Sequence, residues 1–172
     1  MITKILNVIT LSRIFCAILI YLILYLESNY SLALFLFLIA SFSDFLDGYL
    51  ARKTNSESVL GEILDPIADK LLIVFVLIGL SINLDSFLIG FISAVIISRE
   101  IWVAALRDIN SRNNESDKTK VTFLAKTKTA IQMLTVLMYL FGLTINNMTI
   151  LFFADIILII ALLVTIQTGF QY

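Results

Sequence analysis

Apolar runs of about 20 residues recur along the whole chain, and they are the feature that most limits its fold. The sequence has 172 residues, of which 60% are hydrophobic, a single proline and a mean hydropathy of +1.00. A soluble domain is closer to half apolar, whereas a helix of about 20 apolar residues can cross the hydrocarbon core of a bilayer. The sequence therefore predicts one all-α domain, residues 1–172, embedded in a membrane as a polytopic protein.

Six segments fit transmembrane helices, roughly residues 7–26, 31–51, 61–81, 86–106, 124–144 and 149–168. The residues from Lys4 to Arg13 are mildly amphipathic and predict a short N-terminal interfacial segment that leads into the first span. A signal peptide is disfavoured, because Arg13 interrupts the start of the first apolar run and no small-x-small cleavage site follows it. We therefore expect this run to be a retained span.

The 12 Lys and Arg residues gather at alternate connections between the predicted spans. They lie at the N-terminus, in or near the connection at 52–60, and around the loop at 107–123. The connections near 27–30, 82–85 and 145–148 contain none. With six spans, the positive-inside rule places both termini and the basic connections in the cytoplasm. The expected location is the inner (cytoplasmic) membrane of a bacterium.

Four aspartates lie near the ends of the second and third predicted spans that face this basic side. Asp44 and Asp47 fall within one sector of roughly 100° on a helix that turns about 100° per residue. Asp65 and Asp69 are four residues apart and share a face of the next helix. Two helices joined by a short polar turn would therefore each direct two carboxylates toward one place.

Converging carboxylates favour a divalent cation site. Four such groups repel one another and stay ionised only with cations between them, and hard oxygen ligands suit Mg²⁺ or Mn²⁺. An Asp at the centre of a membrane helix costs about 2.5–3.5 kcal/mol, and these off-centre residues together still cost several kcal/mol. Such a cost indicates a functional site rather than a solvated loop with incidental acids.

Basic residues near the fourth and fifth spans allow two interpretations. Arg99 lies about two turns inside the fourth span, so it either snorkels, pairs with an acid, or holds an anion together with Arg107. Lys126 and Lys128, at the start of the fifth span, are either orientation signals or part of the same anion site. Gln132, one turn deeper, could add a polar contact there.

The residue types that the chain lacks also restrict its chemistry. It has no histidine, so proton transfer must use a carboxylate, Lys or Tyr. Cys16 is the single cysteine, so an intramolecular disulfide is impossible. Asp155, in the outer half of the sixth span, has no partner that the sequence identifies.

The aspartates belong to a longer pattern. Asp44-x-x-Asp47-Gly48-x-x-Ala51-Arg52-x8-Gly61-x3-Asp65-x3-Asp69 resembles the signature of the CDP-alcohol phosphatidyltransferases at every motif position. Leu6-Asn7-x-x-Thr10-x-x-Arg13 resembles the family's N-terminal segment, with Leu6 where a proline is common. The stretches Asp65-Pro-Ile-Ala-Asp69-Lys-Leu-Leu, Arg99-Glu-Ile…Leu-Arg107 and Lys126-x-Lys128-Thr-x-x-Gln132-Met resemble the branch that uses glycerol 3-phosphate, with Ala125 where Gly is frequent.

The resemblance implies a six-helix membrane enzyme, commonly a homodimer, with a polar cavity open to the cytoplasm. It implies two Mg²⁺ or Mn²⁺ ions bound by Asp44, Asp47, Asp65 and Asp69, with Asp69 also acting as the general base. It implies a CDP site formed by Asn7, Thr10, Gly48, Arg52, Ser58 and Gly61. We expect the acceptor's phosphate on Arg99, Arg107, Lys126 and Lys128.

The implied reaction transfers a phosphatidyl group from CDP-diacylglycerol to glycerol 3-phosphate and releases CMP. Because neither a Cys nor a His nucleophile is available, we expect direct displacement assisted by the metal ions. Other acceptors remain open, namely phosphatidylglycerol (giving cardiolipin), inositol phosphate, or serine, which the basic cluster disfavours. The partners expected are the two substrates and the bilayer, without nucleic acid.

Two other classes of protein remain as distant alternatives. A divalent-cation transporter would carry carboxylates along a crossing route, whereas all four here lie near one face. A polyprenyl-transferring membrane enzyme also uses aspartate-rich motifs, but such enzymes generally resemble longer chains with the two motifs on distant helices.

Overall fold

The computed structural model describes residues 2–54, 59–112 and 123–169, which form helices joined by short turns and include no strand. The helices are α1 (Ile2–Leu26), α2 (Tyr30–Thr54), α3 (Val59–Asn83), α4 (Phe87–Arg112), α5 (Phe123–Thr144) and α6 (Met148–Gly169). Within them, the side chains at 2–6, 45–54, 59–60, 62–63, 107, 110–112 and 123–126 lie outside the description. The predicted all-α class is confirmed.

The helices extend beyond the predicted spans mainly at the end rich in charged residues. There α2 continues to Thr54 and α4 to Arg112, while α3 begins at Val59. Arg and Lys continue a helix about as well as Leu does, so hydropathy marks the apolar part of a helix and not its end. Pro66 consequently lies inside α3. The N-terminal segment is continuous with α1 and is not a separate helix.

Three of the described helices are apolar and long enough to cross a bilayer, over Asn7–Leu26 of α1, Phe87–Leu106 of α4 and Met148–Gly169 of α6. A shorter apolar stretch in α2 spans Tyr30–Asp44. Large apolar side chains such as Phe15, Trp102 and Phe152 are mostly exposed, as expected for a surface that faces lipid. The chain is therefore an integral membrane protein, and the count of six spans stays a prediction.

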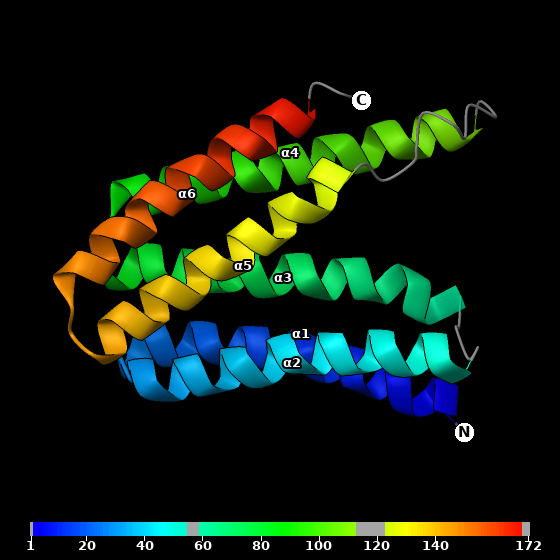
Figure 1. Ribbon diagram of the computed structural model, residues 1–172, viewed down its shortest axis with the longest axis horizontal. Helices are drawn as coiled ribbons and strands as arrows, with labels where there is room; N and C mark the ends of the chain where they lie inside the picture. Colours follow the sequence, from blue (N-terminus) through cyan, green and yellow to red (C-terminus); the bar gives the residue numbers. More distant parts are fainter. Residues whose placement is uncertain (1, 55–58, 113–122, 170–172) are drawn as a thin grey trace.

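Consecutive helices form three tight hairpins: α1–α2, α3–α4 and α5–α6. Each turn contains one non-glycine residue with a left-handed φ, namely Ser28 (51°), Asp85 (47°) and Asn146 (53°). In each turn an amide also donates to a carbonyl five residues earlier, as the Ser86 amide does to Ser81 at 3.0 Å. This pattern closes the last turn of a helix and satisfies its free carbonyls. The three turns lie together at one end of the bundle, the hairpin end (Figure 1).

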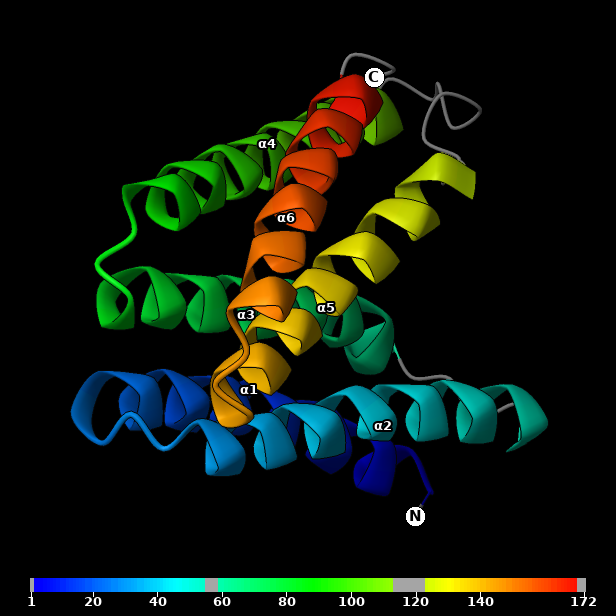
Figure 2. The same cartoon turned by 60° about the vertical axis from the view of Figure 1, so that its left-hand side comes forward.

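The central helix of the bundle is α3, which packs against α1, α4 and α5 (Figures 1 and 2). Helix α2 packs against α1 and α5, and α6 packs against α4 and α5. Buried apolar side chains from all six described helices, such as Ile20, Phe37, Leu77, Ile92 and Leu158, form the core. The opposite end of the bundle, where α1, α3 and α5 begin and α2, α4 and α6 finish, is the charged end (Figure 1).

Candidate active site

Arg13 of α1 joins two of the aspartates at the charged end. Its side chain is fully buried, and its Nη1 donates a hydrogen bond of 2.8 Å to Oδ1 of Asp69 on α3. The same nitrogen lies 3.1 Å from Oδ1 of Asp44 on α2. A buried guanidinium requires negative partners. One cation thus brings carboxylates from two helices together.

Thr10 makes the corresponding contact one turn earlier. Its buried Oγ1 donates a 2.6 Å hydrogen bond to Oδ1 of Asp65. Helices α1 and α3 begin at the same end, so a step from Thr10 to Arg13 on α1 matches a step from Asp65 to Asp69 on α3. Thr10 and Arg13, three residues apart on α1, therefore face Asp65 and Asp69, four residues apart on α3. We call Thr10, Arg13, Asp44, Asp65 and Asp69 the acidic cluster.

The carboxylates of the acidic cluster are suitable ligands for a divalent cation. Asp44 and Asp69 come from different helices, and each directs a carboxylate oxygen at the same cationic nitrogen. Carboxylate oxygens are the ligands that Mg²⁺ and Mn²⁺ prefer. Among the described side chains, however, no three acidic, His or Cys groups are close enough to hold a metal ion. The side chain of Asp47 lies outside the description, so the four-carboxylate site stays a prediction.

A second charged group surrounds Glu100 of α4. Its Oε1 accepts hydrogen bonds from Arg99 Nη1, at 3.0 Å, and from Lys128 Nζ of α5. Its Oε2 lies 3.4 Å from Lys70 Nζ of α3. The Arg99, Glu100 and Lys128 side chains are about nine-tenths buried, whereas Lys70 is 43% exposed. We call these four residues the basic cluster.

Helix α6 supports the basic cluster with two threonines. Arg99 Nη2 donates a 2.9 Å hydrogen bond to Oγ1 of Thr168. One turn away, Gln132 Nε2 donates at 3.1 Å to Oγ1 of Thr165. Both threonines are buried. Gln132 thus lies beside this cluster, and its described contact is with α6.

The acidic and basic clusters meet on consecutive residues of α3. Asp69 contacts Arg13, and Lys70 contacts Glu100. Successive residues of a helix point about 100° apart, so one helix supplies both clusters from adjacent positions. Carboxylates suited to a metal and cations suited to an anion are therefore held by adjacent residues of α3.

Several predicted site residues cannot be compared with this geometry. Gly48 and Arg52 lie in α2, Arg107 in α4 and Lys126 in α5, but their side chains are not among the described ones, and Ser58 lies outside the described residues. Asn7 and Gly61 are described and half-buried in α1 and α3. The predicted roles of these residues therefore stay predictions.

Sequence reasoning did not single out Glu100, Lys70, Thr165 or Thr168 as parts of a charged cluster. One signal was available, because Arg99-Glu100 is a pair of opposite charges inside an otherwise apolar run. Threonines three residues apart in α6 form a polar stripe that a helical projection also reveals. The contacts among four helices could not be read from these patterns.

Asp155, for which the sequence offered no partner, accepts a hydrogen bond from the hydroxyl of Tyr139. Tyr139 is buried in α5 and Asp155 lies in α6, so the bond links the two helices of the last hairpin. Interhelical hydrogen bonds of this kind hold membrane helices together. Tyr139 follows Lys128 by 11 residues, about 16 Å along a helix, which favours a structural role for the contact.

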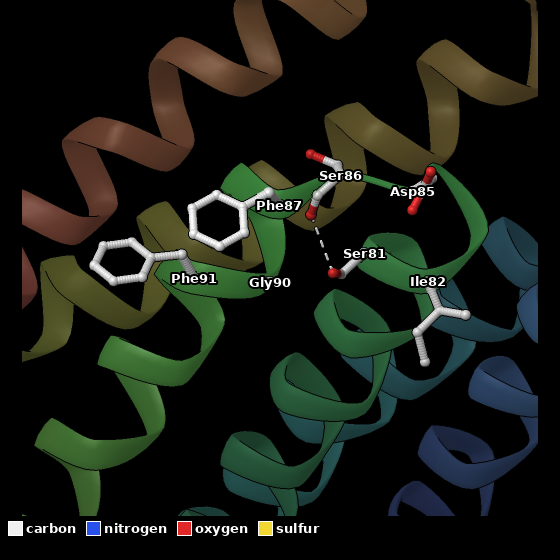
Figure 3. Close-up of a pocket in the computed structure, with 7 residues that line it drawn as sticks. All are labelled: Ser81, Ile82, Asp85, Ser86, Phe87, Gly90 and Phe91. Carbon is white, nitrogen blue, oxygen red and sulfur yellow. Dashed lines mark hydrogen bonds between the residues drawn. The ribbon is translucent and has the colours of Figure 1, made fainter.

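A surface pocket of about 520 Å³ lies at the hairpin end, beside the turn between α3 and α4 (Figure 3). Ser81, Asp85 and Phe91 are among its lining residues, and Ser81 Oγ donates at 3.2 Å to the carbonyl of Ser86. Ser81 follows Asp69 by 12 residues, about 18 Å along a helix. The pocket has one carboxylate and no cation, so it does not suit a phosphate-bearing substrate.

Comparison with known proteins shows the family. The CDP-alcohol phosphatidyltransferase model matches residues 4–167. The CDP-diacylglycerol–glycerol-3-phosphate 3-phosphatidyltransferase of Rickettsia bellii is 39% identical, over 96% of this chain and 91% of its own length. The proteins of the same name from Haemophilus influenzae (37% identical, over 86% and 78%) and Escherichia coli (33% identical, over 74% and 72%) are also similar. This chain is a membrane enzyme that belongs to the CDP-alcohol phosphatidyltransferase family.

Proposed function

We propose that this enzyme transfers the phosphatidyl group of CDP-diacylglycerol to glycerol 3-phosphate, giving phosphatidylglycerophosphate and CMP. The observation that carries the proposal is the contact of Asp69 and Lys70, neighbours on α3, with two clusters of opposite character. A carboxylate-rich cluster suits a metal-bound diphosphate, and a cationic cluster suits a phosphorylated acceptor. The names of the similar proteins support the same pair of substrates.

The acidic cluster is the proposed metal site. Enzymes of this family are generally dependent on a divalent metal, and Asp44, Asp47, Asp65 and Asp69 would hold two ions, Mg²⁺ or Mn²⁺. When bound, such ions draw charge away from the phosphoryl oxygens and stabilise the departing CMP. Arg13 and Thr10 hold Asp44, Asp65 and Asp69 from α1 and so keep the helices that carry them in register.

The CDP group would lie next to the acidic cluster. We assign it to Asn7, Thr10, Gly48, Arg52, Ser58 and Gly61. Thr10 and Asn7 approach from α1, and Gly61 lies one turn before Asp65 on α3. A glycine there allows close contact between the nucleotide and the helix backbone.

The reaction itself would be a direct displacement. The 1-hydroxyl oxygen of glycerol 3-phosphate forms a bond with the β-phosphorus of CDP-diacylglycerol while the bond to the CMP oxygen breaks. Asp69 accepts the hydroxyl proton. A carboxylate is a weak base, but a loose phosphoryl-transfer transition state needs little help from one. Arg99, Arg107, Lys126 and Lys128 would bind the phosphate of the acceptor.

The orientation and assembly are also proposals. The positively charged connections favour an active site and both termini in the cytoplasm, in a bacterial inner membrane. All the chemistry would then take place at the inner headgroup layer, with the lipid tails of the substrate in the bilayer. A homodimer is the expected assembly.

A CMP-release assay tests the proposed function. The purified enzyme in vesicles with CDP-diacylglycerol and Mg²⁺ or Mn²⁺ is given glycerol 3-phosphate, phosphatidylglycerol, inositol phosphate or serine. We expect release of CMP with glycerol 3-phosphate far above the other acceptors. Release that depends on another acceptor would reassign the substrate, and cation flux without CMP release would indicate a transporter.

A further inference from the structure

We propose that Glu100 is a positioning residue of the acceptor site, which holds Arg99 and Lys128 in place for a phosphate monoester dianion. This inference rests on the proposed function, because it gives that reaction's acceptor site a residue outside the predicted set. Glu100 contacts cations from three helices: Arg99 of its own α4, Lys70 of α3 and Lys128 of α5.

The charges of the basic cluster are unbalanced. Arg99, Lys70 and Lys128 carry three positive charges, and Glu100 is the only carboxylate paired with them among the described side chains. The excess of two positive charges matches a phosphate monoester, whose charge at neutral pH is about −1.5 to −2. An uncharged alcohol would leave buried positive charge unmatched, and a phosphodiester, with a single negative charge, would match one of the two excess positive charges.

The guanidinium of Arg99 can donate one more hydrogen bond. Its Nη1 and Nη2 are bonded to Glu100 and Thr168, but its buried Nε has no hydrogen-bond partner among the residues that the structure describes. The side chain is only 10% exposed. A buried guanidinium donor without an acceptor is unfavourable, and an anion bound at this point would satisfy it.

Glu100 is what keeps these cations together. Arg99 and Lys128 share its Oε1, and Lys70 contacts its Oε2. Without the carboxylate, like charges in a poorly solvated region repel one another and their side chains adopt other rotamers. Binding of the phosphate would then have to order these cationic side chains first. The cost of this ordering weakens binding of the phosphorylated acceptor and not that of CDP-diacylglycerol.

The test is the steady-state kinetics of Glu100→Gln in vesicles, with each substrate varied in turn. This change keeps the shape of the side chain and removes its charge. We expect KM for glycerol 3-phosphate to rise about tenfold or more, with KM for CDP-diacylglycerol within about twofold of the unsubstituted enzyme. Glu100→Asp, which restores the charge on a shorter side chain, should give a smaller rise in the same KM.

Glu27→Gln is the matched control, because Glu27 is exposed at the hairpin end and the same chemical change there should alter neither KM. An equal rise in both KM values for Glu100→Gln, or no rise in either, would overturn the inference. If Glu100→Gln does not fold, Glu100→Asp decides alone, since a selective rise in KM for glycerol 3-phosphate supports positioning and its absence refutes it. Loss of the proposed function itself would look different, because the unsubstituted enzyme would then release no CMP with glycerol 3-phosphate.

Discussion

Nη1 of Arg13 donates to Asp69 at 2.8 Å and lies 3.1 Å from Asp44, so one buried guanidinium links α1, α2 and α3. The same carboxylates are those that the sequence assigns to a metal site. A divalent cation and Arg13 would therefore neutralise the same charges, and the stability of the protein should reflect both.

Arg13→Gln should destabilise the protein most when divalent cations are absent. Removing the buried cation takes its contact away from both carboxylates, and because both are partly exposed we expect a loss of no more than about 3 kcal/mol. Thermal unfolding in detergent with a chelator, and then with excess Mg²⁺, measures the effect. Mg²⁺ should recover part of the loss in Arg13→Gln, and Ser12→Ala, at an exposed neighbour, is the control. Equal destabilisation with and without Mg²⁺ would show that the two cations do not share ligands.

Asp69→Asn should abolish turnover and leave CDP binding partly intact. The amide cannot accept the hydroxyl proton and is a poorer ligand for a hard cation, but it keeps the size of the side chain. CMP release measures turnover, and equilibrium binding of a CDP analogue measures the nucleotide site. Near-normal turnover would remove Asp69 as the proposed base.

Thorough chelation should likewise stop lipid synthesis by the unsubstituted enzyme. Readdition of Mg²⁺ or Mn²⁺ should restore CMP release, since the proposed mechanism needs cations on the diphosphate. Ca²⁺ at the same concentration serves as a comparison, because it is larger and prefers more ligands. Robust synthesis in the presence of the chelator would contradict the metal site altogether.

Arg99→Ala should raise KM for glycerol 3-phosphate far more than KM for CDP-diacylglycerol, because Arg99 is proposed to bind only the acceptor. Gly169→Ala provides a gentler test of the same residue. A Cβ at Gly169 would lie 3.3 Å from Cγ and 3.4 Å from Nε of Arg99, so the side chain has to shift. We expect a rise in the same KM of about two- to fivefold. Gly79→Ala, whose Cβ would meet only α1 near Leu24, should lower stability without this selective effect.

Tyr139→Phe should lower stability slightly and leave both KM values unchanged. It removes the hydrogen bond to Asp155, and interhelical hydrogen bonds in membranes contribute on average about 0.6 kcal/mol. A double-mutant cycle with Asp155→Asn, followed by thermal unfolding, isolates the pair. A large change in kcat would indicate that the pair has a role beyond packing.

Much of the helix pattern follows from hydropathy alone. Each apolar run predicts a helix, and the described helices begin and end within a few residues of the predicted spans at the hairpin end. The four-residue spacing of Asp65 and Asp69 also placed these residues on one face, where they meet Thr10 and Arg13 of α1. Local periodicity was sufficient to predict the helices and the shared face of Asp65 and Asp69, because each of these features belongs to a single helix.

The arrangement around Glu100 could not be predicted in the same way. Its partners come from α3, α4 and α5, at positions 70, 99 and 128, and no local pattern specifies which helices become neighbours. The helix ends at the charged end were also missed, because charged residues extend a helix beyond its apolar run. The partner of Asp155 depended on the pairing of α5 with α6, which the short turn at Asn146 brings about.

The neighbouring positions of Asp69 and Lys70 have a consequence for how far such an enzyme can diversify. One peptide unit joins Asp69, the proposed base, to Lys70, a cation of the proposed acceptor site. Bending or sliding of α3 therefore moves both residues together and leaves the distance between them unchanged. An enzyme of this architecture that accepts a longer alcohol would have to gain the extra reach from α4 and α5. We therefore expect residues of those two helices to determine the length of the acceptor, while α3 keeps the distance between Asp69 and Lys70 constant.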